Sequence, residues 1–464
     1  MDNLAQNQTV HSVKLNPMRR VLNLLRRILP SWVFQLQHYL EARFAQIIFR
    51  NPSSKLIVIG IVGSKGKTTT ANILWAILNS KDTPCGLIGT ADIKIGDQTI
   101  KNHWHKTMPG RWYTQQLISK MKSAGCKYVV LEVPSEAQQN WRHIGINFDT
   151  VIFTNVTNEI LKVHKNSLDL LHKHNKRLLS KLNRLKRKKI NEIKIPKTIL
   201  ANQDATDFNE YFKFKADQKF SFSVQEGSDA SFTASNIKNQ IEQSSFIINT
   251  PDGSQDFQIN IPGQVNVSNT LAAVATASLL DIKLSDSAKT LRTYGGVPGR
   301  MNFIKKGQPF TVLIDYAHEE EGLKALLEWA NNSKPKESKI ITLICGQGGG
   351  RDIKKRPAMG AIAAKMSDYI IVSNDDVYDD DPQEIIQDII NGAKKVRPKL
   401  NGIFNIEDRR EGIAKCLNLA KKNDLVLITG KGVDTSMIIA GQKIPWNEHE
   451  VVTKELNKLG YKKN

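Results

Sequence analysis

Hydrophobic residues recur at helical spacing near the start of the chain. In PMRRVLNLLRRILP, residues 17–30, one face of the expected helix carries Met18, Val21, Leu22, Leu25, Ile28 and Leu29, and the opposite face carries Arg19, Arg20, Asn23, Arg26 and Arg27. Pro30-Ser31 then ends this helix and can begin a second one, SWVFQLQHYLEARFAQIIF, before a linker over residues 50–55. Such a pair either docks on the rest of the protein or lies on an anionic membrane surface, and the pattern leaves both interpretations open.

From residue 55 the pattern changes to short apolar runs with helical stretches between most of them. The runs KLIVIGIVG, YVVLEV, TVIFTNV and KTILAN have the length and composition of buried strands, and they occupy residues 55–63, 128–133, 150–156 and 197–202. Alternation of this kind predicts an α/β fold, with a mostly parallel sheet and helices on both of its faces.

Between residues 219 and 260 the polar and apolar positions alternate instead. The segments KFSFSV, SFIINT and FQINI predict an antiparallel β appendage on the same domain, and a helix is expected over 266–280. After YGGVPGR a second α/β series begins, with FTVLIDYA, KIITLICG, DYIIVSND and DLVLITGKG. We therefore expect a basic helical segment over 1–55, a central domain over 56–294 and a C-terminal domain over 295–464.

The formal net charge of +21 indicates an anionic partner, such as a nucleotide, a nucleic acid, an anionic lipid or an acidic small substrate. Part of the excess lies in HKHNKRLLSKLNRLKRKKI, residues 172–190, where Leu178, Leu182 and Leu185 recur at helical spacing. This run is either the solvated face of an amphipathic helix or an anion-binding surface. Nucleic acid is disfavoured because no base-stacking aromatic residues are interleaved with the cations.

The rest of the composition is typical of a soluble globular protein, with 40% hydrophobic and 24% charged residues. No apolar run reaches the roughly 18 to 20 residues that a membrane-spanning helix needs, and the first residues lack the pattern of a signal peptide. Four widely spaced cysteines without CxxC spacing predict reduced thiols in a cytoplasmic protein, namely Cys85, Cys126, Cys345 and Cys416.

The clearest chemical motif is GIVGSKGKTTTANIL, residues 60–74, between a predicted strand and a predicted helix. Glycines let backbone N–H groups turn toward phosphate oxygens, and the helix N-terminus adds partial positive charge. Lys67 can reach the β and γ phosphates, and the Thr68 hydroxyl can ligate Mg²⁺. Because position 61 is isoleucine, the match is GxxGKT rather than the complete eight-residue P-loop pattern. The predicted phosphate cradle consists of Gly63, Ser64, Lys65, Gly66, Lys67, Thr68 and Thr69.

This loop and the motifs after it resemble the Mur ligases, ATP-dependent amide-forming enzymes of peptidoglycan precursor synthesis. The motifs are LEVPSE, FDTVIFTNVT, NVSNTLAA, GVPGRMN, VLIDYAHE, GQGGGRDIKKRP, DDVYDDDP and ITGKGVD, in that order, within residues 56–450. The set is most similar to the UDP-N-acetylmuramoyl-tripeptide synthetases (MurE-type), which add the third residue of the stem peptide. The resemblance implies a central ATPase domain and a C-terminal Rossmann-like domain, whereas the residues before the loop are too few for the family's N-terminal UDP-binding domain.

The family's mechanism implies roles for several residues. A substrate carboxylate attacks the γ-phosphate of ATP, and an amine then attacks the acyl phosphate, so metal ions and cationic side chains must neutralise the anions that meet. By resemblance, Lys67 and Thr68 serve the triphosphate and Mg²⁺, and Glu132 is a second ligand of Mg²⁺. The residues expected near the adenine, or in the closure of the C-terminal domain over ATP, are Asn269, Arg300 and Asp315.

Other positions correspond to substrate contacts of the family. The residues expected to touch the muramoyl substrate are Thr107 and Arg142. The segment GQGGGRD resembles the loop beside the incoming amino acid, where backbone N–H groups and Arg351 could hold a carboxylate. Family members that use diaminopimelate carry Asn-Pro-Arg where this chain has Asp375, Asp376 and Val377, without the arginine. The acidic residues either favour a cationic amino acid such as lysine or form a solvated turn.

The sequence departs from the family around the second metal ion. The family has a histidine ligand where this chain has Ile160, although His164 matches a second family histidine. The family also carries a carbamate-modified lysine further along, for which Lys176 is the candidate. Pro134 and Asn302 replace a serine and a glutamate of the family. These departures put the second metal site in question, whereas the loop and the first metal site keep the family's residues.

The sequence therefore predicts an ATP-dependent ligase that joins an amino acid to a muramoyl-peptide carboxylate, with ATP and Mg²⁺ as cofactors. The expected catalytic residues are Lys67, Glu132, Lys176 and Arg300. The short N-terminal region leads us to expect that UDP is held differently or that the acceptor is lipid-linked, with residues 12–50 at the membrane. Two alternatives remain: a ligase like folylpolyglutamate synthase, and a nucleotide-binding relative with degraded catalysis that acts as a scaffold or regulator.

Overall fold

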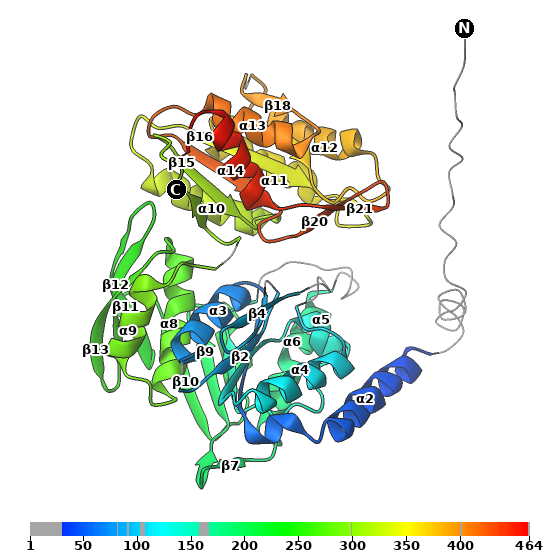
Figure 1. The fold of residues 1–464 in the computed structure, drawn as a ribbon, viewed down its shortest axis with the longest axis vertical. Helices are drawn as coiled ribbons and strands as arrows, with labels where there is room; N and C mark the ends of the chain where they lie inside the picture. The colour runs from blue at the N-terminus through cyan, green and yellow to red at the C-terminus, as the bar shows by residue number, and fades with distance from the viewer. Residues whose placement is uncertain are drawn as a thin grey trace.

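Two β-sheets, each with helices on both faces, lie one above the other in Figure 1. The computed structural model describes residues 30–462, apart from residues 81, 91, 103–106, 157–166, 298 and 400. The arrangement confirms the predicted α/β fold class, and the amphipathic helix predicted within 17–30 lies outside the described residues except for Pro30. The domain boundary near residue 294 stays a prediction: α9 (Leu284–Thr293) ends before it and β14 (Asn302–Ile304) begins after it.

The first sheet has eleven strands in the order β13-β12-β11-β10-β9-β6-β1-β5-β2-β3-β4. Their bounds are β1 (Ile57–Val62), β2 (Cys85–Ile88), β3 (Asp92–Ile95), β4 (Gln98–Lys101), β5 (Tyr128–Glu132), β6 (Thr150–Phe153), β9 (Thr198–Asn202), β10 (Gln218–Ser223), β11 (Phe232–Asn239), β12 (Ser244–Thr250) and β13 (Gly253–Ile259). Neighbours from β2 to β11 are parallel, and only the two edges are antiparallel. The appendage predicted over 219–260 is therefore antiparallel in β11–β13 but not in β10, which pairs in parallel with both neighbours.

Helices cover both faces of this sheet and explain why β1 is apolar throughout. The helices are α3 (Lys67–Leu78), α4 (Arg111–Ser123), α5 (Ser135–Gln139), α6 (Leu168–Leu182), α7 (Phe208–Phe212), α8 (Gln264–Ser278) and α9. Ile59 and Ile61 share a core with α3, α8 and α9, whereas Val58 and Val62 share a core with α4 and α6. A parallel strand between two helical layers requires apolar side chains on both faces.

The second sheet has six strands in the order β14-β15-β19-β16-β17-β18, of which only β14 runs antiparallel. The further strands are β15 (Thr311–Asp315), β16 (Ile340–Gly346), β17 (Tyr369–Asn374), β18 (Ile403–Asn405) and β19 (Leu425–Thr429), and a separate hairpin joins β20 (Ser436–Ile439) to β21 (Gln442–Pro445). The helices are α10 (Glu320–Ser333), α11 (Lys355–Met366), α12 (Pro382–Val396), α13 (Arg409–Leu419) and α14 (Glu448–Lys458). The four cysteines of the chain are buried free thiols.

The hairpin between β11 and β12 joins the two sheets. Its tip rises from the lower unit toward the upper one in Figure 1, and Ile241 packs against the core of the second sheet. Glu242 also forms an ion pair with Lys305, with 2.6 Å between Oε2 and Nζ. The hairpin is therefore a physical link between the two units besides the chain connection.

Ahead of the first strand, the described residues form α2 (Ser31–Ile48) and the 3-10 helix η1 (Pro52–Lys55). The linker predicted over residues 50–55 is wrong, because Pro52 and Ser53 are buried and the Ser53 hydroxyl accepts a hydrogen bond from the N–H of Asn147 at 3.0 Å. No helix in the described part of the chain is long and apolar enough to cross a membrane.

The basic run over 172–190 is not one helix. Helix α6 ends at Leu182, and β7 (Lys188–Ile190) pairs with β8 (Ile193–Ile195) in a small hairpin. Several cations of the run have partners within the fold. Arg177 and Lys181 lie over the ring of Trp141, and Arg187 pairs with Asp217. Much of the run is therefore used for internal contacts.

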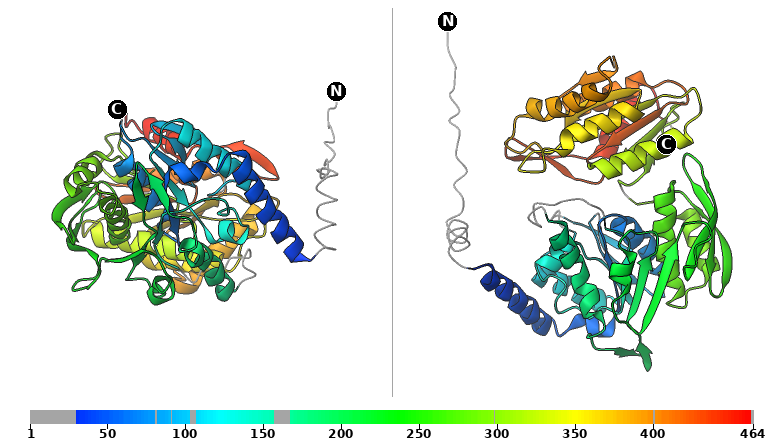
Figure 2. Two further views of the ribbon diagram at one scale, coloured as in Figure 1. Left: turned by 90° about the horizontal axis from the view of Figure 1, so that it is seen from below. Right: turned by 180° about the vertical axis from the view of Figure 1, so that it is seen from behind.

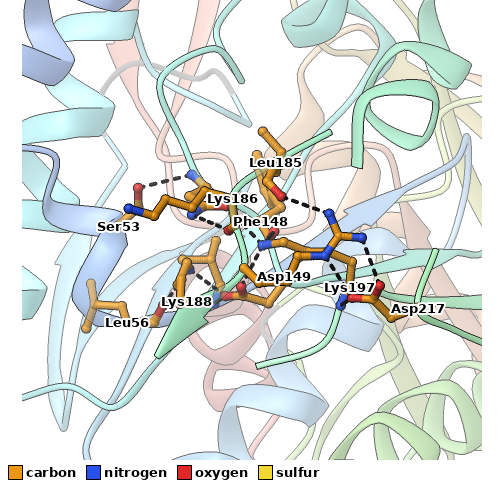
Figure 3. A network of polar contacts seen from close by, with 12 residues as sticks. Ser53, Leu56, Phe148, Asp149, Leu185, Lys186, Lys188, Lys197 and Asp217 are labelled. Carbon is orange, nitrogen blue, oxygen red and sulfur yellow. Dashed lines mark hydrogen bonds and ion pairs between the residues drawn. The ribbon is translucent and has the colours of Figure 1, made fainter. Parts of the chain in front are cut away.

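Asp149, at the amino edge of the first sheet, holds two buried lysines (Figure 3). Its carboxylate pairs with Lys188 at 2.5 Å and with Lys197 at 2.9 Å, and it also accepts the N–H of Val58 at 2.9 Å. Lys188 donates to the carbonyl of Leu56, which precedes β1. Burial lowers the pKa of Lys188 to about 8, although Asp149 opposes that effect. This network joins the amino-terminal ends of β1, β6, β7 and β9.

We expect Asp149→Asn to destabilise the fold by about 3 to 5 kcal/mol, because it leaves two buried ammonium groups without their carboxylate. Urea unfolding followed by circular dichroism measures this change. Glu192→Gln is the matched control, since Glu192 pairs with Lys189 in the same hairpin but both side chains are exposed. The control should change stability by at most about 1 kcal/mol. Equal effects of the two variants would contradict a structural role for the Asp149 network.

Candidate active site

The loop after β1 turns sharply and is held by residues distant in sequence. Gly63 and Gly66 have φ values of 135° and 81°, which residues other than glycine rarely adopt. The backbone carbonyl of Asn155 accepts the N–H of Ser64 at 2.8 Å, and its side-chain oxygen accepts the N–H of Lys65 at 2.9 Å. A Cβ on Gly66 would lie 2.3 Å from Oδ1 of Asn269, on α8. The glycines are therefore required by close packing as well as by backbone conformation.

Thr68 and Glu132 meet at the mouth of this loop. Helix α3 begins at Lys67, and the Thr68 hydroxyl donates to Glu132 Oε2 at 2.8 Å. Thr90 donates to the same carboxylate with its N–H at 2.8 Å and with its hydroxyl at 2.9 Å. The ammonium of Lys67 donates to the carbonyls of Gly63 and Ser64, each at 2.7 Å. The structure thus brings together the predicted lysine, threonine and glutamate.

Glu132 is completely buried at the carboxyl end of β5. Burial raises its pKa, and the hydrogen bonds from Thr90 and Thr68 and the charge of Lys67 oppose that rise. No group of three or more His, Cys, Asp or Glu side chains suited to a metal occurs among the described residues. Mg²⁺ usually binds through one or two carboxylates together with substrate phosphates and water. One carboxylate and one hydroxyl beside a phosphate cradle fit that pattern, with Glu132 and Thr68 as the protein's donors.

Arg300 and Asp315 lie where the second sheet approaches the first. Asp315 accepts the N–H groups of Met301 and Ala317, each at 2.9 Å, and the guanidinium of Arg300 lies 4.6 Å from the ring centre of Tyr316. Removal from water raises the pKa of Asp315, and the charge of Arg300 opposes this rise. The loop that carries Arg300 is therefore anchored to the end of β15.

A buried ammonium group surrounded by carboxylates forms the opposite wall. Lys431 pairs with Asp375 at 3.1 Å, Asp376 at 3.0 Å and Asp434 at 3.3 Å. Burial alone would lower the pKa of Lys431, but the three carboxylates together raise it. Burial also raises the pKa of Asp434 to about 6, despite the charge of Lys431. Asp375 is fully buried, whereas Asp376 and Asp434 reach the neighbouring cavity.

Two cavities open between the sheets and share Arg300 and Asn302. The first, of about 510 Å³, is lined from the lower unit by Thr68, Thr90, Asp92 and Asn102, and from the upper unit by Arg300, Tyr316, Gln347, Arg351, Asp376, Tyr378 and Asp434, among others. The second, of about 910 Å³, is lined by the tip of the β11–β12 hairpin, Asn260, Lys305 and Ser333, among others. The predicted cradle and the predicted amino-acid loop therefore face one space.

The remaining predicted residues are placed differently. The Thr107 hydroxyl lies within hydrogen-bonding distance of the Thr90 hydroxyl, with 3.0 Å between the oxygens, beside the cradle. The guanidinium of Arg142 donates to the carbonyl of Met108 and pairs with the carboxylate of Glu136, each at 3.0 Å. Lys176 forms an ion pair with Glu210 and does not occur among the described residues that line either cavity. A carbamate on Lys176 would be repelled by this carboxylate. Ile160 and His164 lie outside the described residues.

Several residues of the cavity were not predicted from the sequence. Lys431 and Asp434 both lie in ITGKGVD, which was recognised as a motif without a role for either side chain. Tyr378 adopts a φ of 55°, and its ring packs against Gly349 of the glycine-rich loop. The acidic stretch 374–382 was the available signal for Tyr378, whereas nothing in the sequence marked Asp92 or Asn102.

The sequence matches the models of two protein families, the Mur ligase middle domain over residues 61–277 and the Mur ligase, glutamate ligase domain over residues 299–432. The UDP-N-acetylmuramoyl-L-alanyl-D-glutamate--2,6-diaminopimelate ligase of Caldanaerobacter subterraneus is 33% identical over 411 residues, which cover 89% of this chain and 80% of that protein. The chain belongs to the Mur ligase family. A second relative of this Mur ligase, the UDP-N-acetylmuramyl-tripeptide synthetase of Roseiflexus, is 30% identical and covers 90% of this chain and 82% of its own.

Solved structures share the fold of this Mur ligase. A UDP-N-acetylmuramoyl-L-alanyl-D-glutamate--2,6-diaminopimelate ligase superposes with a TM-score of 0.63 at 22% identity, over 92% of this chain and 83% of that one. The folylpolyglutamate synthase of Mycobacterium tuberculosis, complexed with ADP, gives a TM-score of 0.67 at 13% identity, over 96% and 98%. At these identities both show the fold alone. The family models and the sequence relatives favour the Mur branch.

We expect Gly66→Ala to weaken ATP binding at least tenfold, because its Cβ would collide with Asn269 and displace the loop. Titration of the purified protein with a fluorescent ATP analogue measures the affinity. Gly227→Ala is the matched control, since Gly227 has a similar φ of 75° but no atom within 4 Å of the added Cβ. The control should keep its ATP affinity and lose about 1 kcal/mol of stability. Unchanged binding by Gly66→Ala would show that the loop does not hold the nucleotide.

Proposed function

We propose that this Mur ligase joins an amino acid to a muramoyl-peptide carboxylate at the expense of ATP. The substrate carboxylate attacks the γ-phosphorus, the bond from that phosphorus to the β-γ bridging oxygen breaks, and ADP leaves. The amine nitrogen of the amino acid then attacks the acyl carbon, the carbon–oxygen bond to phosphate breaks, and the amine loses a proton. The products are the amide, ADP and inorganic phosphate.

The observation that carries this proposal is that one cavity contains both halves of the chemistry. Thr68 and Thr90 lie on one wall, and their hydroxyls donate hydrogen bonds to the buried Glu132. The opposite wall is lined by Arg300, Arg351 and Asp434. Holding two reactants in reacting geometry can lower a barrier by about 7 to 11 kcal/mol. A cavity shared by a phosphate cradle and a separate charged wall supports such a two-substrate reaction.

The chain's own residues would bind and orient the phosphates. The N–H groups of the loop and the start of α3 present partial positive charge to them. Lys67 would exchange its two carbonyl partners for phosphate oxygens, and Arg300 would approach from the second sheet. Mg²⁺ bound by Thr68 and Glu132 would neutralise phosphate charge. Asn269 and Asp315 remain predicted contacts of the nucleotide.

We further propose that the incoming amino acid has a cationic side chain, such as lysine. Three carboxylates against the one ammonium of Lys431 leave a net charge of −2 when all are ionised. Asp376 and Asp434 present this charge to the cavity, and Arg351 lies on the same wall to bind a carboxylate. The buried Asp375 would contribute through its charge rather than by contact.

The acceptor is proposed to be a muramoyl dipeptide ending in a free carboxylate, by analogy with the names of the relatives. Thr107 lies beside Thr90 and remains the proposed contact nearest the cavity. The acceptor's carrier is either UDP or a lipid. Parallel assays with both forms of the acceptor would separate these possibilities.

The decisive measurement is phosphate release from ATP over a panel of amino acids, with and without the muramoyl dipeptide. We expect release only when both substrates are present, and fastest with a cationic amino acid. Glu132→Gln should lower kcat by about 100-fold or more, because it removes charge from the metal and phosphate site. ATP binding without acceptor-dependent release would instead support the non-catalytic scaffold. Fastest release with a neutral amino acid would remove the proposed specificity.

A pH profile tests the role of Asp434. Because the pKa of Asp434 is about 6, its carboxylate is neutralised as the pH falls below about 6 and its attraction for an ammonium group is lost. The KM for the amino acid should then rise, and Asp434→Asn should show a raised KM without this step. Asp379→Asn is the control, since Asp379 is exposed in the same acidic stretch and does not line the described cavity. Identical profiles for the wild type and Asp434→Asn would contradict the assignment.

A further inference from the structure

Helix α2 is fixed to the body of the protein along one side. Ala42 and Ala45 are completely buried against the rest of the chain, and Glu41 pairs with Arg111 at the start of α4, with 3.0 Å between Oε2 and Nη1. The C-terminal part of the helix lies against the lower unit, and its N-terminal end projects away from that unit (Figure 2). A ligand that binds the outer side of α2 therefore anchors the rest of the protein as well.

The outer side of α2 is a continuous apolar stripe. Its members are between 49% and 71% exposed and recur every three or four residues, and they are Leu36, Leu40, Phe44, Ile47 and Ile48. Trp112, on α4, is 41% exposed and extends the stripe, with 6.2 Å between the ring centres of Phe44 and Trp112. These are six of the twelve exposed large hydrophobic residues of the described chain, and a contiguous patch of this kind marks an interaction surface.

The chain that leads into this stripe is cationic. From Asn3 to Leu40 there is no aspartate or glutamate, and the same stretch contains five cationic residues, Lys14, Arg19, Arg20, Arg26 and Arg27. An apolar helix face beside a cluster of basic residues is the combination that binds the interface of an anionic bilayer. Phe44 and Trp112 are also residue types that contribute strongly to such binding.

We propose that the outer stripe of α2, with the basic residues that precede it, docks this protein on an anionic lipid bilayer. The stripe would lie in the headgroup region and not span the bilayer, since no described helix is long and apolar enough to cross a membrane. Since α2 supplies none of the described residues that line the two cavities, the cleft stays accessible to substrates when the stripe is covered.

Two other occupants fit the observations less well. A second copy of the chain would bring two sets of five cations close together, and no acid in the same stretch would offset their repulsion. The chain's own first helix, as expected from its sequence pattern, would be joined to α2 by Pro30 alone. Antiparallel neighbouring helices are usually connected by about 2 to 8 residues, so a fold-back onto the stripe is disfavoured.

Vesicle co-sedimentation of the full-length protein tests the proposal. Wild-type protein should sediment with vesicles of phosphatidylcholine and phosphatidylglycerol, less at high salt, and little with phosphatidylcholine alone. Leu40→Glu should weaken this binding about tenfold or more, because burial of one leucine contributes on that order. Ile193→Glu is the matched control, since Ile193 is 66% exposed in the hairpin of β7 and β8, outside the stripe, and should leave binding unchanged. Arg26→Gln with Arg27→Gln should reduce the salt-sensitive part.

Thermal melting establishes that each variant is folded, and ultracentrifugation gives its oligomeric state. Two results would overturn the proposal: no sedimentation of the wild type with the anionic vesicles, or equal losses in Leu40→Glu and Ile193→Glu. Conversion of a dimer to a monomer by Leu40→Glu, with vesicle binding unchanged, would assign the stripe to a second copy instead. None of these outcomes depends on the ligase reaction, which can be assayed separately with soluble substrates.

Discussion

The close approach of the loop after β1 to its neighbours is the constraint on which the site depends. Asn155 holds two N–H groups of the loop, and the glycines leave room for Thr154 and for Asn269. These neighbours come from the end of β6 and from α8, so the shape of the loop is set by elements distant in sequence. The same turn begins α3 and places the Thr68 hydroxyl against Glu132 on the adjacent strand β5. A change in the packing of β6 or α8 therefore alters the geometry of the phosphate cradle without touching a phosphate.

The two walls of the cleft are each built around one buried charged residue, and the two residues have opposite charges. On the loop's wall, the Thr68 hydroxyl, the N–H and hydroxyl of Thr90 and the charge of Lys67 surround a single buried carboxylate, Glu132. The wall formed by the second sheet gathers carboxylates around a single buried ammonium, Lys431. The carboxylates of the second wall attract a cationic substrate group, whereas Arg300 and Arg351 on that wall can still bind anionic groups. In each wall the buried counter-charge fixes its neighbours in place, since leaving it unpaired would cost several kcal/mol, on the order of 3 to 5.

The local sequence pattern was sufficient to predict some elements of the structure, but residues that pair over long distances in the chain could not be predicted from it. Apolar runs such as Ile57–Val62 predicted strands correctly because burial on both faces depends little on context, and the glycines and Lys67 predicted the loop because their chemistry is local. The leucine spacing over 172–190 is typical of one helix, but α6 ends at Leu182, and Lys188 lies in β7, where it pairs with the buried Asp149. The sequence left Asp375 either as part of a solvated turn or as a group that attracts a cationic amino acid, whereas the structure buries it against Lys431, far along the chain. Long-range pairs of this kind cannot be found from spacing.

The two ends of strand β6 contribute to different parts of the structure. Its first residue follows the buried carboxylate of Asp149, and its last precedes Thr154 and Asn155, which shape the loop. Inherited changes at the two ends would therefore have distinguishable effects in a living cell. Changes at the amino end would reduce how much of the enzyme escapes proteolysis while each surviving molecule keeps its turnover. Changes at the carboxyl end would leave the amount of enzyme unaltered and slow every molecule, so that raising expression would rescue the first class far more readily than the second.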